Sequence, residues 1–118
     1  MPTDSPAVSP TLADVQRTVD EWIRSTGCGY FSELTNAVIL AEETGEVSRV
    51  MARLYGDQKA KPGDKISLAD ELADLLWVLT AIANQTGVDL TQAFAANLQK
   101  KNLRDKYRFQ SANTEPTS

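Results

Sequence analysis

Apolar residues recur at helical spacing through most of this chain. The stripes run over four stretches, and each stretch begins or ends at a residue that favours a helix terminus. Thr11 and Asp14 form a capping-box pattern before the first stripe, and Gly56 and Gly87 follow the second and third. The pattern predicts helices over about 11–26, 32–55 and 67–86, and a fourth from about 89.

These four predicted helices are joined by short connections, and no stretch alternates apolar and polar residues as a strand would. A chain of 118 residues with this pattern is expected to form one domain over 11–108. The expected fold is all-α and four-helix bundle-like. Residues 1–10 and 109–118 are rich in Pro, Ser, Thr and Asn and are expected to form flexible tails.

Two pairs of acidic residues interrupt these apolar stripes. Glu43 and Glu46 lie in the second predicted helix, and Glu71 and Asp74 lie in the third, both at a spacing of i, i+3. Residues three apart share one face of a helix, so each pair projects to one side. A carboxylate on an apolar face is costly unless it is protonated, paired or bound to a metal. A single pair of this kind is more often a solvated helix face, but two pairs on apolar stripes favour a metal site.

The composition restricts the metal. The chain contains no histidine, so the usual nitrogen ligand of zinc and copper is missing. Carboxylate oxygens favour magnesium, manganese or calcium. We therefore expect Glu43, Glu46, Glu71 and Asp74 to bind one of these hard divalent cations. Glu42 neighbours Glu46 on the helical wheel and either acts on a water at the site or is solvated.

Basic and aromatic residues offer further candidate contacts. Lys101, Arg104 and Arg108 follow the fourth apolar stripe and could contact a phosphate bound at the metal. The alternative is a helix end favoured by its dipole and a solvated tail. Tyr30 and Phe31 precede the second predicted helix in a loop and are candidates to line a pocket, where they would stack on a base or ring.

The charge and the apolar surfaces indicate the expected partners. A net charge of −4 argues against nucleic acid as a ligand. No apolar stretch is long enough to span a membrane, and no basic segment followed by an apolar run is visible at the start, so a cytoplasmic location is expected. The third predicted helix is apolar on both faces, which favours its burial against a second subunit.

At this point the motifs resemble a known family. Glu-Glu-Thr-Gly-Glu at 42–46 and Glu-Leu-Ala-Asp at 71–74 are similar to the E-E-x-x-E … E-x-x-D signature of the MazG-like nucleoside triphosphate pyrophosphohydrolases. The resemblance extends over about 11–108. It implies an all-α enzyme, assembled as a homodimer or homotetramer, that uses Mg²⁺ (with Mn²⁺ as a substitute) to hydrolyse a nucleoside triphosphate to a monophosphate and pyrophosphate. The resemblance gives the four acids as metal ligands and Glu42 as the additional acid of the motif.

Two alternatives remain open at this point. Phosphoribosyl-ATP pyrophosphohydrolase of histidine synthesis shares the expected architecture, and it differs from the first reading in substrate only. A non-catalytic helical interaction module with a structural metal site would account for the same acidic pairs without any turnover. The motifs do not identify the nucleotide.

Overall fold

The structure is a computed structural model, and it describes residues 9–57, 61–63 and 67–113, with the backbone alone for 107 and 109–113. Most of the predicted N-terminal tail, the end of the predicted C-terminal tail and parts of the loop after Gly56 lie outside the described residues.

The described chain folds into four helices: α1 Leu12–Ser25, α2 Glu33–Tyr55, α3 Leu68–Thr86 and α4 Leu90–Asn113. No strand occurs in the described ranges, so the all-α prediction is confirmed. α4 continues to Asn113, beyond position 108, where the predicted domain ends. This extension is consistent with the sequence, because no proline occurs between 108 and Pro116.

Local hydrogen bonds explain where the helices begin and end. The hydroxyl of Thr11 accepts from the backbone N–H of Asp14, whose carboxylate accepts from the N–H of Thr11, which completes a capping box. Ser32 and Ser67 cap α2 and α3 through their own hydroxyl oxygens. Gly87 ends α3 at a φ of 73°, a left-handed conformation that favours glycine.

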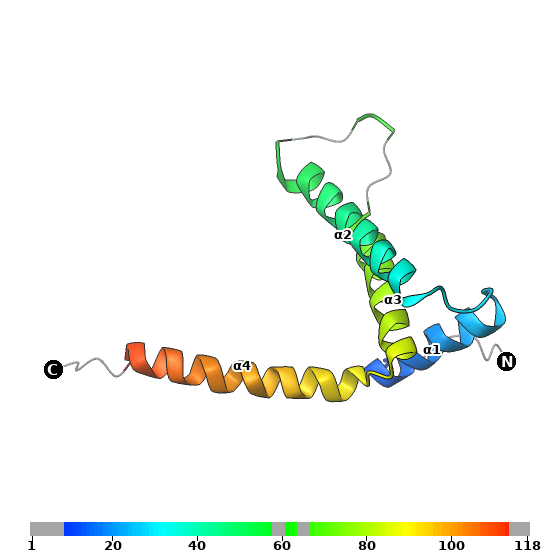
Figure 1. Cartoon of the computed structure of the whole chain (residues 1–118). Helices are drawn as coiled ribbons and strands as arrows, with labels where there is room; N and C mark the ends of the chain where they lie inside the picture. Colours follow the sequence, from blue (N-terminus) through cyan, green and yellow to red (C-terminus); the bar gives the residue numbers. More distant parts are fainter. Residues whose placement is uncertain (1–8, 58–60, 64–66, 114–118) are drawn as a thin grey trace.

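The helices form an open arrangement (Figure 1). α2 and α3 lie side by side as an antiparallel hairpin, α1 crosses the far end of α3, and α4 leaves from that same end and points away from the hairpin. The Cα radius of gyration is 19.4 Å, whereas a compact chain of this length is expected to have a radius of gyration of about 13 Å. One chain therefore does not close a four-helix bundle.

The core lies where α1 crosses α3. Val19 and Ile23 of α1 pack with Ala81 of α3, and Val15 and Tyr30 cover the edge of this cluster. The side-chain amide of Gln16 in α1 also donates to Asn84 and to the carbonyl oxygen of Val88, and it accepts from the backbone N–H of Leu90. None of the described helices is long and apolar enough to cross a membrane.

Many large apolar side chains lie outside this core. They occupy the outer faces of α2, α3 and α4, and they include Leu34, Val38, Met51, Leu54, Leu72, Leu76, Leu79, Phe94, Leu98 and Leu103. Contiguous apolar surface of this kind marks a site of association.

Candidate metal centre and neighbouring pocket

Three of the predicted metal ligands come together where α2 and α3 lie side by side. Glu43 of α2 and Glu71 and Asp74 of α3 each offer one carboxylate oxygen, and these oxygens all lie within 4.8 Å of one another. Glu43 and Glu71 are half-buried, and Asp74 is exposed. The i, i+3 spacing aims Glu71 and Asp74 at α2, and the antiparallel packing of the hairpin supplies Glu43 opposite them.

This geometry fits a hard divalent cation. With Mg–O bonds of about 2.0–2.1 Å, oxygens in one octahedral shell are separated by about 2.9–4.2 Å. Small side-chain rotations would therefore bring the three carboxylates of this cluster onto one ion. Three carboxylates leave positions for waters and substrate oxygens, which is the arrangement that magnesium favours.

Burial and charge repulsion act in the same direction on Glu43 in this cluster. Partial burial, followed by the negative charges of Asp74, Glu71, Glu46 and Glu42, raises the pKa of Glu43 above its usual value. Every one of these neighbouring charges is a carboxylate. A cation bound among them would remove this repulsion, so the charge distribution agrees with the donor set.

The other two predicted acids lie outside the three-carboxylate cluster. The carboxylate of Glu46 accepts hydrogen bonds from Nε and Nη2 of Arg49, one turn along the same helix, at 3.2 and 3.1 Å. Glu42 is exposed on α2. Both therefore lie next to the cluster on α2, and a rotation of the Glu46 side chain away from Arg49 is needed for it to join the other three.

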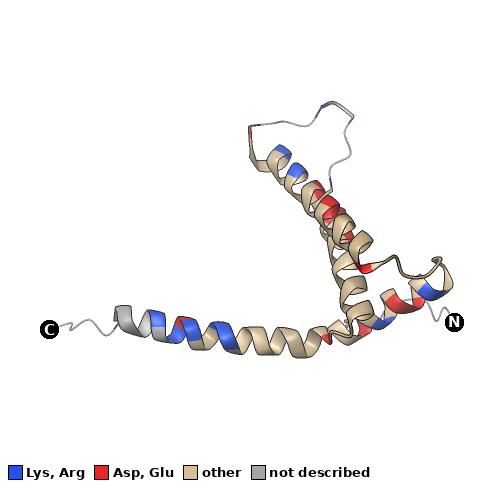
Figure 2. Ribbon diagram, viewed as in Figure 1, with Lys and Arg blue, Asp and Glu red and all other residues tan. Residues whose placement is uncertain are grey.

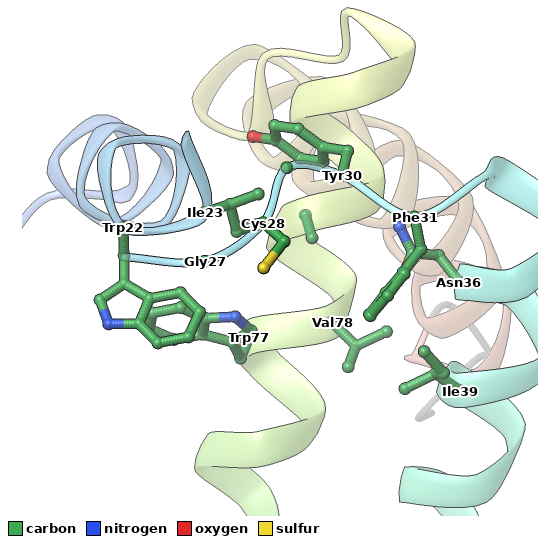
Figure 3. Close-up of a pocket in the computed structure, with 12 residues that line it drawn as sticks. Trp22, Ile23, Gly27, Cys28, Tyr30, Phe31, Asn36, Ile39, Trp77 and Val78 are labelled. Atoms are coloured by element: carbon green, nitrogen blue, oxygen red, sulfur yellow. The ribbon is translucent and has the colours of Figure 1, made fainter. Parts of the chain in front are cut away.

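A pocket of about 500 Å³ lies beside the acidic cluster (Figure 3). Ile39 and Val78 line it, and each is one helical turn from an acid, Glu43 and Asp74 respectively. The full lining is mostly apolar and aromatic: Trp22, Ile23, Gly27, Cys28, Gly29, Tyr30, Phe31, Asn36, Ile39, Trp77, Val78 and Ala81.

Tyr30 and Phe31, the two predicted aromatic contacts, both line this pocket. The Tyr30 hydroxyl donates to Asp20, and burial together with this bond raises the pKa of Tyr30. Phe31 is exposed, with its ring among the side chains around the opening. Trp22 and Trp77 form an additional wall, an edge-to-face pair with ring centroids 5.3 Å apart.

Asn36 is a pocket residue that the sequence analysis missed. Its side chain is only 5% exposed, and its Nδ2 donates to Oε1 of Gln85 at 2.7 Å. Gln85 in turn donates through Nε2 to the carbonyl oxygen of Phe31 at 2.9 Å. The signal was present, because Asn36 is seven residues before Glu43 and so shares its face of α2.

The predicted phosphate contacts lie far from the acids within one chain. Lys101, Arg104 and Arg108 are exposed on α4, and Figure 2 shows these basic residues well away from the acidic stretch of α2. Arg104 pairs with Asp105 at 3.2 Å. The single chain therefore brings together acids and pocket, but it does not bring the basic residues to them.

Comparison with known proteins gives a consistent result. A family model, the MazG nucleotide pyrophosphohydrolase domain, matches residues 31–109. The chain is 39% identical over 101 residues to YpjD of Bacillus subtilis, covering 84% of this chain and 90% of that protein. It is 29% identical over 100 residues to dCTP pyrophosphatase 1 of Bos taurus, covering 80% of this chain and 59% of that protein.

Solved structures agree. The crystal structure of the Bacillus-conserved MazG protein, a nucleotide pyrophosphohydrolase, matches with a TM-score of 0.70 and 34% identity. It covers 80% of this chain and 93% of that one. The crystal structure of YpjD from Bacillus subtilis matches with a TM-score of 0.72 and 35% identity, covering 80% of this chain and 97% of that one.

Proposed function

Because this chain belongs to the MazG nucleotide pyrophosphohydrolase family and is a nucleotide pyrophosphohydrolase, we propose the site and substrate class of its reaction. The substrate is a ribo- or deoxyribonucleoside triphosphate, and the products are a monophosphate and pyrophosphate. The cofactor is Mg²⁺, with Mn²⁺ as a substitute. One observation carries this proposal: three carboxylates from two helices lie within 4.8 Å of one another beside an aromatic pocket.

In this proposal Glu43, Glu71 and Asp74 hold the cation, and Glu46 joins them when its carboxylate turns from Arg49. The bound cation supplies charge neutralisation for the triphosphate and lowers the pKa of a water. Glu42 lies beside the cluster and orients the attacking water or accepts its proton. The water oxygen forms a bond to the α-phosphorus, the bond from that phosphorus to the bridging oxygen breaks, and pyrophosphate leaves.

The pocket takes the ring end of the nucleotide. Its lining is predominantly apolar and aromatic, with Tyr30 and Phe31 at the loop and the amide of Asn36 on the wall. Flat aromatic rings offer stacking surface to a base, and one fixed amide supplies a hydrogen-bond partner. Because the pocket begins one helical turn from the acids, a nucleotide can place its ring in the pocket and its phosphates at the cation.

The working form is a homo-oligomer, either a dimer or a tetramer. The support for this is the apolar outer surface of α2, α3 and α4, since side chains such as Leu34 and Val38 are exposed to solvent in one chain. The enzyme acts on the nucleotide pool of the cytoplasm, where surplus or noncanonical triphosphates are its class of substrate.

A product assay in labelled water tests the proposed reaction. The full-length protein is incubated with each common dNTP and NTP, and with phosphoribosyl-ATP, in H₂¹⁸O with Mg²⁺, Mn²⁺ or EDTA. We expect monophosphate and pyrophosphate to form with either metal, with the label in the monophosphate, and neither to form in EDTA.

Label in the pyrophosphate would mean attack on the β-phosphorus, and a diphosphate with free phosphate would mean cleavage of the other anhydride. Either result would contradict the proposal. Turnover of phosphoribosyl-ATP alone would replace the proposed substrate class while leaving the site intact.

A further inference from the structure

A relay of side-chain amides joins α2 and α3 at the wall of the pocket. Nδ2 of Asn36 in α2 donates to Oε1 of Gln85 in α3 at 2.7 Å. Nε2 of Gln85 donates to the carbonyl oxygen of Phe31 at 2.9 Å and to the carboxylate of Glu33 at 3.4 Å. The relay therefore connects a pocket side chain to the backbone of the loop that carries Phe31.

This relay fixes the orientation of the Asn36 amide. The Phe31 carbonyl and the Glu33 carboxylate can only accept hydrogen bonds, so Gln85 must direct its NH₂ group toward them and its oxygen toward Asn36. Because the oxygen of Gln85 also only accepts, Asn36 must place Nδ2 against it. The orientation thus follows from a backbone carbonyl, whose polarity no side-chain rotation can reverse.

Oδ1 of Asn36 is left to face the pocket. Within the ranges that the structure describes, the hydrogen bond of this side chain is made by Nδ2, and no sealed side-chain polar atom lacks a partner. Oδ1 therefore opens onto free space. Asn36 is 5% exposed and lines the pocket, where Figure 3 shows it beside Phe31, so that space is the pocket. A nearly buried acceptor of this kind is unfavourable until a donor meets it.

The distance from the acids determines which part of a nucleotide reaches Asn36. Asn36 and Glu43 are two helical turns apart on one face of α2, about 10 Å along the helix axis. Ile39 lines the pocket between them. A nucleotide extends over a comparable distance from its α-phosphate to the base edge that lies furthest from the sugar. With the phosphates at the acids, that edge therefore meets Oδ1 of Asn36.

The substituent at this edge differs between the bases. Cytosine carries an amino group at C4 and adenine carries one at C6, whereas uracil, thymine, guanine and hypoxanthine carry a keto oxygen at the same place. An amino group donates to Oδ1, but a keto oxygen sets two acceptors against each other with no proton between them. A site built to pair with a donor rejects a ligand that lacks it, because a buried polar group then stays unpaired.

We infer that Asn36 selects bases with an amino group at this edge, and that Gln85 is the positioning residue that fixes the selection. Oδ1 of Asn36 accepts from the C4 amino group of cytosine or the C6 amino group of adenine. The inference rests on the proposed function, which places the triphosphate at the acids, and it names the class of base that the proposed function leaves open. The preferred substrates are then cytosine and adenine nucleotides.

Paired substrates that differ at this edge test the selection. The kcat/KM of pyrophosphate release is measured with the full-length protein and Mg²⁺ for dCTP against dUTP and for dATP against dITP. The amino member of each pair is expected to have the higher kcat/KM by about tenfold or more, which is the effect of leaving one buried polar group unpaired. A ratio near one, or a preference for the keto member, would overturn the selection.

Gln85→Leu tests the positioning role. Without the relay the Asn36 amide can turn and present Nδ2 to the pocket, so kcat/KM should rise for dUTP and fall for dCTP, and their ratio should approach one. Damage to the fold would lower both values together and leave the ratio unchanged. An unchanged ratio in this variant would therefore overturn the positioning role.

Two further variants accompany Gln85→Leu. Asn36→Ala removes the acceptor itself and should also bring the ratio of dCTP to dUTP toward one, chiefly because kcat/KM for dCTP falls. Gln92→Leu is the matched control, since it removes an exposed glutamine amide on α4 that does not line the pocket. The control should keep the wild-type ratio. A wild-type ratio in Asn36→Ala would show that another group reads the base and would overturn the selection by Asn36.

Binding of monophosphates separates this inference from the proposed function. In calorimetry with Mg²⁺, the wild-type protein should bind dCMP about tenfold more tightly than dUMP, and Gln85→Leu should bind the two with similar affinity. If dCTP and dUTP released pyrophosphate with equal kcat/KM, the selection would fail and the proposed function would stand. If no triphosphate released pyrophosphate while dCMP was preferred, the proposed function would fail and the selection would stand.

Discussion

The two ends of the α2–α3 hairpin differ in how far one chain completes them. At the end crossed by α1, Val19, Ile23 and Ala81 form a buried cluster. At the acidic end, Leu72 and Leu76 are exposed, and the carboxylates face one another without a counter-charge among the neighbours that shift the pKa of Glu43. The first end is completed by the chain itself, and the second is the end at which we propose that a cation binds.

The polar groups of the two ends show the same contrast. Amides at the α1 end satisfy one another, as Gln16 does with Asn84 and Asn36 does with Gln85. A neutral amide both donates and accepts, so two of them can be paired without a ligand. Carboxylates only accept when ionised, so three together repel and need an external positive charge. The paired amides therefore maintain the fold at the α1 end, and the acidic end is where we propose that the reaction takes place.

The largest effect is expected from neutralising the acidic end. Glu71→Gln removes one carboxylate of the cluster while keeping the size of the side chain, so pyrophosphate release should fall by at least about 100-fold. The melting temperature without metal should stay equal or rise, because a like-charge repulsion is removed. Magnesium should raise the melting temperature of the wild type but not that of the variant, as measured by calorimetry.

Glu21→Gln is the matched control, since Glu21 is exposed on α1. It should leave both activity and the magnesium response unchanged. A Glu71→Gln variant that keeps its turnover would remove the contrast between the two ends.

A smaller effect is expected from opening the buried cluster. Val19→Ala deletes two methyl groups at a position that is buried between α1 and α3, and this should lower the free energy of unfolding by about 2 kcal/mol. Activity per folded molecule should be retained, because Val19 does not line the pocket. Urea unfolding and the product assay, both well below the melting temperature, give the two measurements.

Val88→Ala provides the comparison, because Val88 is exposed in the connection between α3 and α4 and lies outside the apolar outer faces of α2, α3 and α4. A loss within about 0.5 kcal/mol is expected there. A loss as large as that of Val19→Ala would contradict the special role of the buried cluster between α1 and α3.

The smallest effect concerns the start of α1. Thr11→Ala removes the hydroxyl that accepts from the backbone of Asp14, and loss of such a cap costs about 1 kcal/mol of stability. Because α1 completes the buried end only, the variant should unfold at lower urea with unchanged turnover. Ser9→Ala, two residues earlier and exposed, should have no measurable effect. Equal losses from the two variants would mean that the capping box does not hold α1 in place.

Much of the local structure followed from the sequence. The hydroxyl caps at Thr11, Ser32 and Ser67 and the glycine at 87 mark the helix ends, because their hydrogen bonds and backbone angles involve residues within a few positions of one another. The acidic pairs were also visible, since i, i+3 spacing fixes which side chains share a face. The assignment to an all-α pyrophosphohydrolase family followed from those pairs and their context.

The arrangement of the candidate site was harder to predict from the sequence. The spacing predicted four ligands, whereas the structure gathers Glu43, Glu71 and Asp74, and Glu46 turns to Arg49. Which rotamer a carboxylate takes depends on a neighbouring arginine, and a helical wheel does not contain that competition. Asn36 was missed for a similar reason, because its partner Gln85 is 49 residues away.

The sequence by itself determined the four helices, their caps and the acidic pairs, all of which depend on interactions within a turn or two of the chain. Only the tertiary structure decided that α4 points away from the acids. Within one chain, Lys101 and Arg104 therefore lie far from the acidic cluster. That direction depends on Gln16, whose bonds to Asn84 and Leu90 join residues 68 and 74 positions apart. No local pattern encodes such a contact, because it exists only after α1 has packed across α3.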